Sequence, residues 1–233
     1  MTKRIPLVLL LLFALTLAGC QALLFTGAAI FVGTHTKPDH DILLKGEKRL
    51  AIVPRSMYSN AYELQNAPRE IARHVNSLLD ENIRNNDRPN YRNKKLTIVE
   101  QSKVEAWLDN CNNDFESFVE VGRDKSIKAD IVIGFDIIGI QVRDPQNPYL
   151  VQGKCQVHVK AIEVATGKVL ASESLMIVDP PNMPLDAAGR PGLEHQFRAQ
   201  FVQTIAQQIA ALFHYYDKNK LQRIDADNLE MHR

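Results

Sequence analysis

The amino-acid sequence predicts an α/β fold of the α+β kind, in which helices pack on a mixed β-sheet in two layers. Residues 130–142 form a long β-branched run, and residues 151–164 alternate apolar with polar side chains as a half-buried strand does. Residues 193–213 instead repeat their large apolar side chains at helical spacing. Strand and helix patterns in one chain of this size lead to helices layered on a sheet.

The first part of the domain shows a strand, a helix and a second strand. Residues 49–54 and 96–99 are short apolar runs that predict buried strands. Between them, Asn66 can cap a helix and Pro68 suits its first turn. The apolar residues that follow recur at helical spacing and end before a breaker at 85–89.

Two short helices and three consecutive strands are expected next. Ser102 and Glu105 have the spacing of a capping box, and Asp114 is expected to begin the following helix. After the two long strands, residues 169–178 form a third strand behind a tight turn. With the final helix, the predicted order is β-α-β-α-α-β-β-β-α.

The N-terminus carries the pattern of a secretory signal. Lys3 and Arg4 precede an almost unbroken apolar run at 5–17. The run ends in small residues before a cysteine, an ending that resembles the lipobox of bacterial lipoproteins and consists of Leu17, Ala18, Gly19 and Cys20. The resemblance implies cleavage before Cys20, lipid that includes palmitate on that cysteine, and a chain that works at a membrane surface.

An uncleaved signal anchor is the alternative. Apolar residues resume after Gln21, and residues 5–32 could span a bilayer, which takes about 20 apolar residues. On the lipoprotein interpretation, residues 22–32 lie at the membrane interface and add to the hold of the acyl chains. Gln21 follows the cysteine, and resemblance to the sorting rule of enteric lipoproteins then favours the outer over the inner membrane.

These features divide the chain into four parts: a signal peptide at 1–19, a lipidated apolar stretch and tether at 20–45, a single domain at 46–216 and a charged tail at 217–233. The domain is long enough to bury a proper core. With 28 basic and 27 acidic residues, the chain has no basic stripe of the kind that nucleic acid requires. We therefore expect no nucleic-acid partner.

No catalytic or metal-binding constellation stands out. The histidines lack HExxH spacing, and the chain has no GxSxG elbow and no P-loop. His35 and His40 lie near two aspartates, but within the predicted tether, where a solvated segment is expected. Asp130 and Asp136 share one face of a strand; we expect Asp130 to mark the strand start and Asp136 to face solvent or a lysine. The sequence predicts no enzyme, no cofactor and no metal site.

Two cysteines remain once Cys20 carries lipid, in a compartment that permits disulfides. Cys111 lies in a loop pattern and Cys155 in a strand pattern. They either form a bridge with each other or are an unrelated loop thiol and a small buried hydrophobe.

Two loops are candidates for partner binding, because long loops in compact domains often carry function. The loop at 144–150 projects between two long strands and contains Pro145, Pro148 and Tyr149. The loop at 179–192 is rich in proline and contains Pro180, Pro181 and Pro184. The alternative is that both loops simply cross the edge of the sheet.

The order of elements resembles a group of periplasmic lipoproteins and domains that includes CsgG, PelC, LpoB and the N-terminal domain of TolB. The segments that carry the resemblance are 49–54 with its helix, Gly122-Arg123 leading into 129–134, the hairpin around 165–168 and the last helix. Within this group the chain looks closest to uncharacterised lipoproteins of planctomycete type, on the strength of Gly122-Arg123 and of Phe197-Arg198 with Phe201. The resemblance covers about residues 45–216.

This resemblance implies a membrane-anchored, periplasm-facing protein that binds partners in the cell-envelope machinery without enzymatic activity. A first alternative is a ring-forming homo-oligomer that supports secretion or export. A pore is disfavoured, since the hairpin at 151–178 has to serve as core sheet and cannot also cross the membrane. A second alternative is an unrecognised envelope enzyme, because a fold does not by itself fix a function. The sequence does not name the partner.

Overall fold

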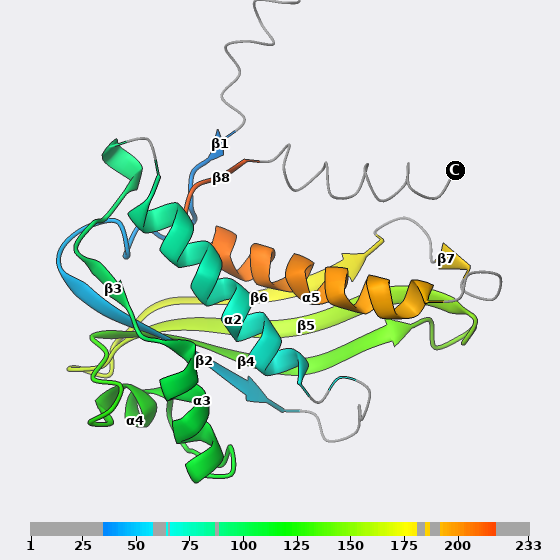
Figure 1. Cartoon of the computed structure of the whole chain (residues 1–233), viewed down its shortest axis with the longest axis horizontal. Coiled ribbons are helices and arrows are strands. Elements are labelled where there is room, and N and C mark those ends of the chain that lie inside the picture. Colours follow the sequence, from blue (N-terminus) through cyan, green and yellow to red (C-terminus); the bar gives the residue numbers. More distant parts are fainter. Residues whose placement is uncertain are drawn as a thin grey trace, which may run out of the picture.

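A mixed β-sheet of six strands forms the centre of the computed structural model, which describes residues 35–57, 64, 66–86, 89–180, 185–186 and 192–217 (Figure 1). The strands are β2 (Lys48–Ser56), β3 (Leu96–Ile98), β4 (Ile131–Arg143), β5 (Leu150–Glu163), β6 (Val169–Asp179) and β7 (Leu185–Asp186). They follow the order β3-β2-β4-β5-β6, with β7 beside β5. β2 runs parallel to β3 and β4, and the other pairs are antiparallel. The predicted fold class is confirmed.

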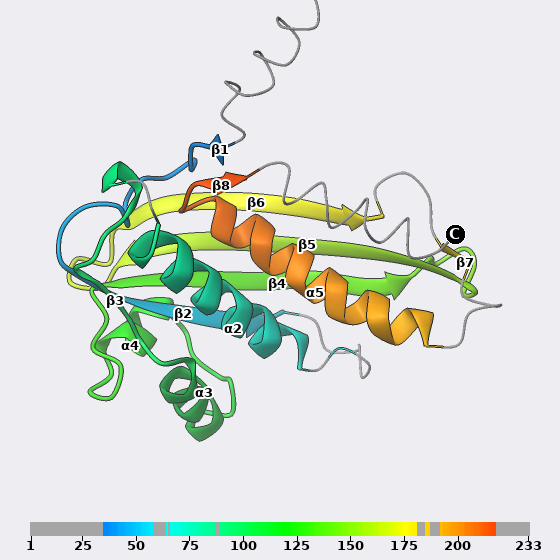
Figure 2. The ribbon, with the colours of Figure 1, turned by 45° about the horizontal axis from the view of Figure 1, so that its top comes forward.

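One face of the sheet is covered by two helices that lie side by side, α2 (Ala67–Leu79) and α5 (Leu193–Ala211) (Figure 2). A π-helical turn, Asp80–Arg84, extends α2. Alternate side chains of β4 and β5 point toward these helices and form the main core, which includes the fully buried Phe135, Phe201 and Phe213. The helical spacing of apolar residues in 193–213 therefore marks the side of α5 that packs on the sheet.

The opposite face is covered at one end only, by α3 (Gln101–Asn110) and α4 (Phe118–Arg123) (Figure 1). A second apolar cluster forms there between Val53, Val132 and Phe118. Gly134 of β4 lies directly under α4, because a Cβ on it would come 2.4 Å from the Phe118 ring. Gly139, further along β4, would meet nothing within 4 Å. The helices of the described residues therefore cover both faces of the sheet at one end and only one face at the other.

Two predicted helix caps are wrong. Glu100 precedes α3 and no side chain caps it, because the Glu105 carboxylate binds Arg73 of α2 instead of returning to the backbone. α4 is capped by Ser117, whose Oγ accepts a hydrogen bond from Val119 N–H at 3.2 Å. Asp114 belongs to the turn before it. An ion pair and a turn with left-handed backbone at Asn112 thus override local sequence patterns.

The carboxyl-terminal part of the segment predicted as a tether belongs to the folded domain. Leu43 is fully buried in the main core. His40 N–H donates to Leu212 O at 2.9 Å, and Asn93 Nδ2 donates to Leu43 O at 3.0 Å. In addition, β1 (His35–Thr36) pairs with β8 (Tyr216–Asp217), so that the two ends of the described domain meet. The packed structure therefore begins before residue 46.

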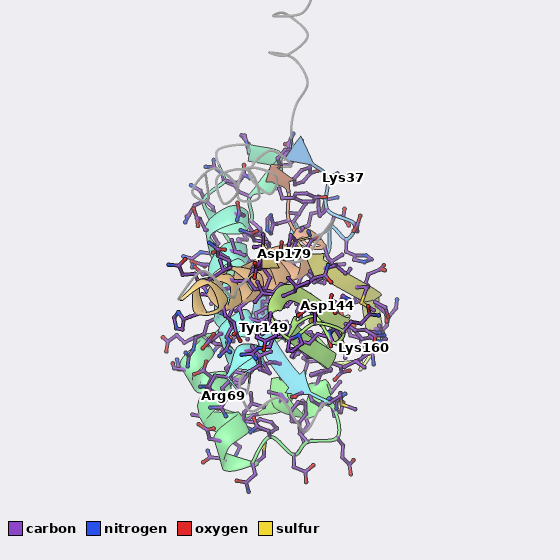
Figure 3. The ribbon with its side chains drawn as sticks, turned by 90° about the vertical axis from the view of Figure 1, so that its right-hand side faces the viewer. Lys37, Arg69, Asp144, Tyr149, Lys160 and Asp179 are labelled. Atoms are coloured by element: carbon purple, nitrogen blue, oxygen red, sulfur yellow. The ribbon has the colours of Figure 1, made fainter. Side chains whose placement is uncertain are left out.

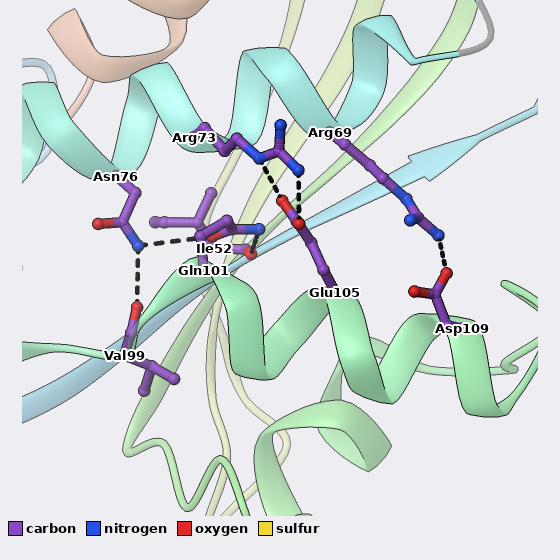
Figure 4. A network of polar contacts seen from close by, with 8 residues as sticks. All are labelled: Ile52, Arg69, Arg73, Asn76, Val99, Gln101, Glu105 and Asp109. Carbon is purple, nitrogen blue, oxygen red and sulfur yellow. Dashed lines mark hydrogen bonds and ion pairs between the residues drawn. The ribbon is translucent and has the colours of Figure 1, made fainter.

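A ladder of polar contacts joins α2 to α3 around the edge of the sheet (Figure 4). Arg73 forms a bidentate ion pair with Glu105, at 2.7 Å for each bond, which raises the pKa of the guanidinium. Arg69 pairs with Asp109 one turn away. At the other end of the ladder, Gln101 Nε2 donates to Ile52 O at 3.2 Å. Such exposed pairs add little stability singly, but they fix α3 against the part of β2 that β3 leaves unpaired.

Among the described residues, no helix combines the length and the apolar character that crossing a membrane would require.

Candidate partner-binding surface

The predicted site residues fall into two sets. The lipidation residues Leu17, Ala18, Gly19 and Cys20 lie outside the described residues, as do Pro181 and Pro184 of the second loop. Pro145, Pro148 and Tyr149 lie on the turn between β4 and β5, and Pro180 follows β6. The geometry of the site therefore rests on this second set.

The turn between β4 and β5 is held in shape by its own hydrogen bonds. Asp144 N–H donates to Leu150 O at 2.9 Å across its base. The side chains of Asp144 and Asn147 accept hydrogen bonds from the backbone two residues on, at 2.7 and 3.1 Å. Asp and Asn favour such turns for this reason. The turn presents the Tyr149 ring, which is 68% exposed.

The structure brings the two predicted loops together at one end of the molecule (Figure 3). β7 lies within the second loop and pairs with β5, so that Asp186 faces Leu150 and Leu185 faces Val151. Nearby, the Gln152 side chain donates to Pro180 O at 3.3 Å. The loops do not cross the sheet edge independently. They form one surface, here called the end surface, defined by Pro145, Pro148, Tyr149, Pro180 and β7.

Contacts with α5 hold the strands that carry the end surface in place. Arg143 binds both carboxylate oxygens of Glu194, at 3.1 and 2.8 Å. Thr204 Oγ1 donates to the Asp179 carboxylate at 3.3 Å. Gly153 lies so close to α5 that a Cβ would come 2.5 Å from the ring of Phe201. These contacts hold the ends of β4, β5 and β6 on residues 194–204 of the helix.

Asp136 is not solvent-facing, contrary to the prediction. It is 8% exposed, and its carboxylate accepts from Arg55 Nε at 2.5 Å. The Arg55 guanidinium also lies over Phe118 and Phe115, 4.7 and 5.4 Å from the ring centroids. Asp130 does mark the start of β4, where it accepts from Arg49 N–H at 2.7 Å. Both carboxylates therefore have structural partners.

The described residues contain no group of three or more histidine, cysteine, aspartate or glutamate side chains that could hold a metal ion. His40, from the segment predicted as a tether, lies 3.2 Å from the Glu173 carboxylate. It is therefore held against β6 rather than free in solvent.

Cys111 and Cys155 are free, so the disulfide alternative is wrong. Cys155 is a buried member of the main core, and burial raises the pKa of its thiol to about 12. Cys111 is half-buried, and its thiol donates to Leu108 O at 3.4 Å. These positions agree with the alternative that Cys111 is an unrelated loop thiol and Cys155 a small buried hydrophobe.

Local alternation did not predict the exposed apolar residues on the strands of the sheet. Ile138 is 45% exposed and Met176 is 65% exposed, although both lie in long strands. The pairing register of β4 shifts between Ile137 and Gly139. A bulge of this kind changes which side chains face the helices, and simple alternation could not reveal it.

No family model matches the chain, and no curated protein matches it. Several solved structures are similar to it. The PelC dodecamer from Paraburkholderia phytofirmans has 13% identity and a TM-score of 0.40, covering 77% of this chain and 95% of that chain. Lipoprotein GNA1162 from Neisseria meningitidis has 13% identity and a TM-score of 0.40, with coverages of 68% and 98%. The LpoB C-terminal domain from Salmonella enterica has 17% identity and a TM-score of 0.29, with coverages of 57% and 84%.

PelC and LpoB belong to the group that the sequence resembles. At these identities and TM-scores, the likeness carries no argument about the function of this chain. The narrower resemblance to planctomycete-type lipoproteins stays a prediction.

Proposed function

We propose that the chain is a lipid-anchored interaction module of the cell envelope, which faces the periplasm and binds a protein partner without catalysing a reaction. The N-terminal pattern that ends in Cys20 supports the anchor. The end surface supports the binding role. Partner binding rather than chemistry fits the contacts of Asp130 and Asp136, since each already has a structural partner.

One observation carries the proposal: two loops far apart in sequence meet at the end surface and present an exposed tyrosine on a turn fixed by hydrogen bonds. Tyrosine is enriched at protein interfaces, because its ring supplies apolar area and its hydroxyl a hydrogen bond. A turn that is already ordered loses little further conformational entropy on binding. The end surface therefore suits recognition of a protein.

The first described residues, which follow the predicted anchor, and the end surface lie at opposite ends of α5. Leu193 begins the helix beside the Arg143–Glu194 pair, and Leu212 follows its last residue and accepts from His40 N–H. A helix of 19 residues separates the two regions by about 28 Å, at about 1.5 Å per residue. A chain attached to a membrane through residues before His35 could thus leave the end surface accessible.

Site-specific photo-crosslinking in intact cells tests the binding role. A photoreactive amino acid replaces Tyr149, and the matched control places it at Lys125, which is exposed in the turn after α4. We expect Tyr149 to give a discrete crosslink to an envelope protein that Lys125 does not give. Equal crosslinking from both positions, or none from Tyr149, would remove the end surface from the proposal.

Replacing Cys20 tests the anchor. We expect Cys20→Ser to accumulate at the precursor mass and to lose lipid labelling by radioactive palmitate. An unchanged mass and unchanged membrane attachment would favour the uncleaved signal anchor. Separation of the two membranes then tests the preference for the outer membrane, which rests on Gln21.

The non-enzymatic part of the proposal has its own test. A hydrolytic or transfer activity of the purified chain that is lost on mutating a few clustered polar residues would refute it.

A ring-forming structural component is the second candidate, and one observation favours it. β6 is the last strand of the sheet path, and no strand of the described residues pairs with its outer side. Exposed edge strands of this length can pair with another copy of the chain. Light scattering on the detergent-extracted protein should then give a discrete multimer, whereas a monomer would exclude this candidate.

A further inference from the structure

The uncovered part of the second sheet face has a composition that points to a ligand. Beside and beyond α4, side chains of β4, β5 and β6 project from this face, and no helix of the described residues lies above them. Figure 3 shows Lys160 on the side of the sheet opposite α5. We call this area the open face; it consists of Ile138, Lys154, Gln156, His158, Lys160 and Met176.

The charged side chains of the open face that form no ion pair within the described residues are both lysines, Lys154 and Lys160, while His158 between them is hydrogen-bonded to Ser172 at 2.9 Å. Lys154, His158 and Lys160 alternate along β5 with the buried Cys155, Val157 and Val159, so they project to the same side. Lys154 and Lys160 form no ion pair with any of the described residues. The carboxylate on this face is Asp136, which faces His158 in the register, and Arg55 neutralises it at 2.5 Å.

Exposed apolar side chains lie near these two lysines. Met176 pairs with Gln156 across β5 and β6, and Gln156 pairs on its other side with Gly139, above which the space is empty. Ile138 is exposed next to that glycine. An exposed isoleucine on the inner strand β4 and an exposed methionine on the edge strand β6, beside unpaired lysines, suit a binding surface.

We propose that the open face docks an acidic, partly apolar segment of a partner protein. The carboxylates of that segment pair with Lys154 and Lys160, which lie six residues apart, or about 20 Å along the strand. Its apolar side chains pack on Met176 and Ile138. This surface is distinct from the end surface, so the inference goes beyond the proposed function.

Two other occupants fit the open face less well. A second copy of this chain that docked by the same face would place lysines against lysines, which opposes association. A bilayer is broad and flat, and α3 and α4 stand one layer above the strands on the same side (Figure 1). A membrane would touch these helices first, whereas a narrow protein segment can lie on the strands beside them.

Binding of charged probes to the full chain in detergent tests the inference. One probe is a fluorescent peptide that alternates glutamate with leucine, and the other alternates lysine with leucine. We expect the glutamate peptide to bind the natural chain, and Lys154→Glu/Lys160→Glu to weaken this binding by about tenfold. The same variant should bind the lysine peptide more tightly than the natural chain does.

The matched control is Lys94→Glu/Lys95→Glu, which reverses two exposed lysines beside β3 at the opposite edge of the sheet. It should keep the affinity for the glutamate peptide. Equal losses of affinity in both variants, or no binding of this peptide, would overturn the inference. So would a result in which Lys154→Glu/Lys160→Glu weakens only the binding of the chain to vesicles of phosphatidylglycerol. Unchanged thermal unfolding of both variants excludes misfolding as the cause, and the crosslink from Tyr149 reports separately on the end surface.

Discussion

Leu43 gives the most direct test of where the domain begins. Its side chain has 0% exposure and packs among the main core residues. Each buried methylene contributes about 0.8 kcal/mol, and the cavity left behind adds to the loss, so that Leu→Ala substitutions in cores cost about 2–5 kcal/mol. We therefore expect Leu43→Ala to lower the free energy of unfolding by about 3 kcal/mol.

The matched control is Leu44→Ala, because Leu44 is the same residue type at the next position and is only partly buried. It loses part of the transfer free energy and leaves no sealed cavity, so we expect a loss of about 1 kcal/mol.

Urea unfolding of the full chain in mild detergent measures both variants. The fluorescence of Trp107, the single tryptophan, reports on the second apolar cluster, and far-ultraviolet circular dichroism reports on the whole domain. With a urea dependence of about 2 kcal/mol per molar, Leu43→Ala should shift the midpoint by about 1.5 M. Equal and small effects, below about 0.5 kcal/mol for both variants, would refute the reasoning and return residues 37–45 to a free tether.

Four further predictions concern the strands and the two free cysteines. Gly134→Ala should cost about 1–3 kcal/mol in urea unfolding, because its Cβ would displace the Phe118 ring, whereas Gly139→Ala on the same strand should cost less than about 0.5 kcal/mol. Asp136→Ala should lower the free energy of unfolding by about 2–3 kcal/mol. This loss is somewhat smaller than that from breaking a fully buried pair, since the unpaired Arg55 side chain is 23% exposed. Cys155 should resist maleimide at pH 8 while Cys111 reacts, as read by peptide mass. Because the folded Cys155 thiol keeps its proton up to about pH 12 and the unfolded thiol ionises near pH 9, the free energy of unfolding should fall as pH rises between these values.

Each of these predictions has an outcome that contradicts it. Equal effects of the two glycine substitutions would mean that α4 does not cover Gly134. An Asp136→Ala variant as stable as the natural chain would mean that the pair with Arg55 contributes nothing. Protection of both cysteines from maleimide, reversed by a reductant, would indicate the bridge after all. For the pH effect, Cys155→Ala should flatten the dependence between pH 9 and 12.

The strands were predictable because their signals are local. Residues 130–142 and 169–178 lie within one residue of β4 and β6 at either end, since β-branched runs and turn residues mark strand limits directly. The close approach at Gly134 was also foreseeable, because a glycine inside a strand often marks tight packing. Helix caps were less predictable. Glu105 satisfies the local spacing of a capping box, yet its carboxylate binds an arginine from another helix.

The candidate binding surfaces were only partly predictable. Tyr149 and its prolines could be singled out as a loop, but nothing local indicates that β7 joins the second loop to β5. The buried state of Asp136 depends on an arginine 81 residues away in sequence. The open face depends on how far α4 reaches over the sheet and on a bulge in β4, and both are properties of the assembled layers.

The sequence by itself determined the N-terminal signal pattern, the order of the elements and the faces that their apolar residues offer, because each of these depends on side chains a few positions apart. Only the tertiary structure decided that residues 37–45 belong to the domain, that two distant loops share one end, and that one sheet face is half uncovered. Those outcomes depend on contacts between segments far apart in the chain, where burial of apolar area and pairing of charges outweigh local preference.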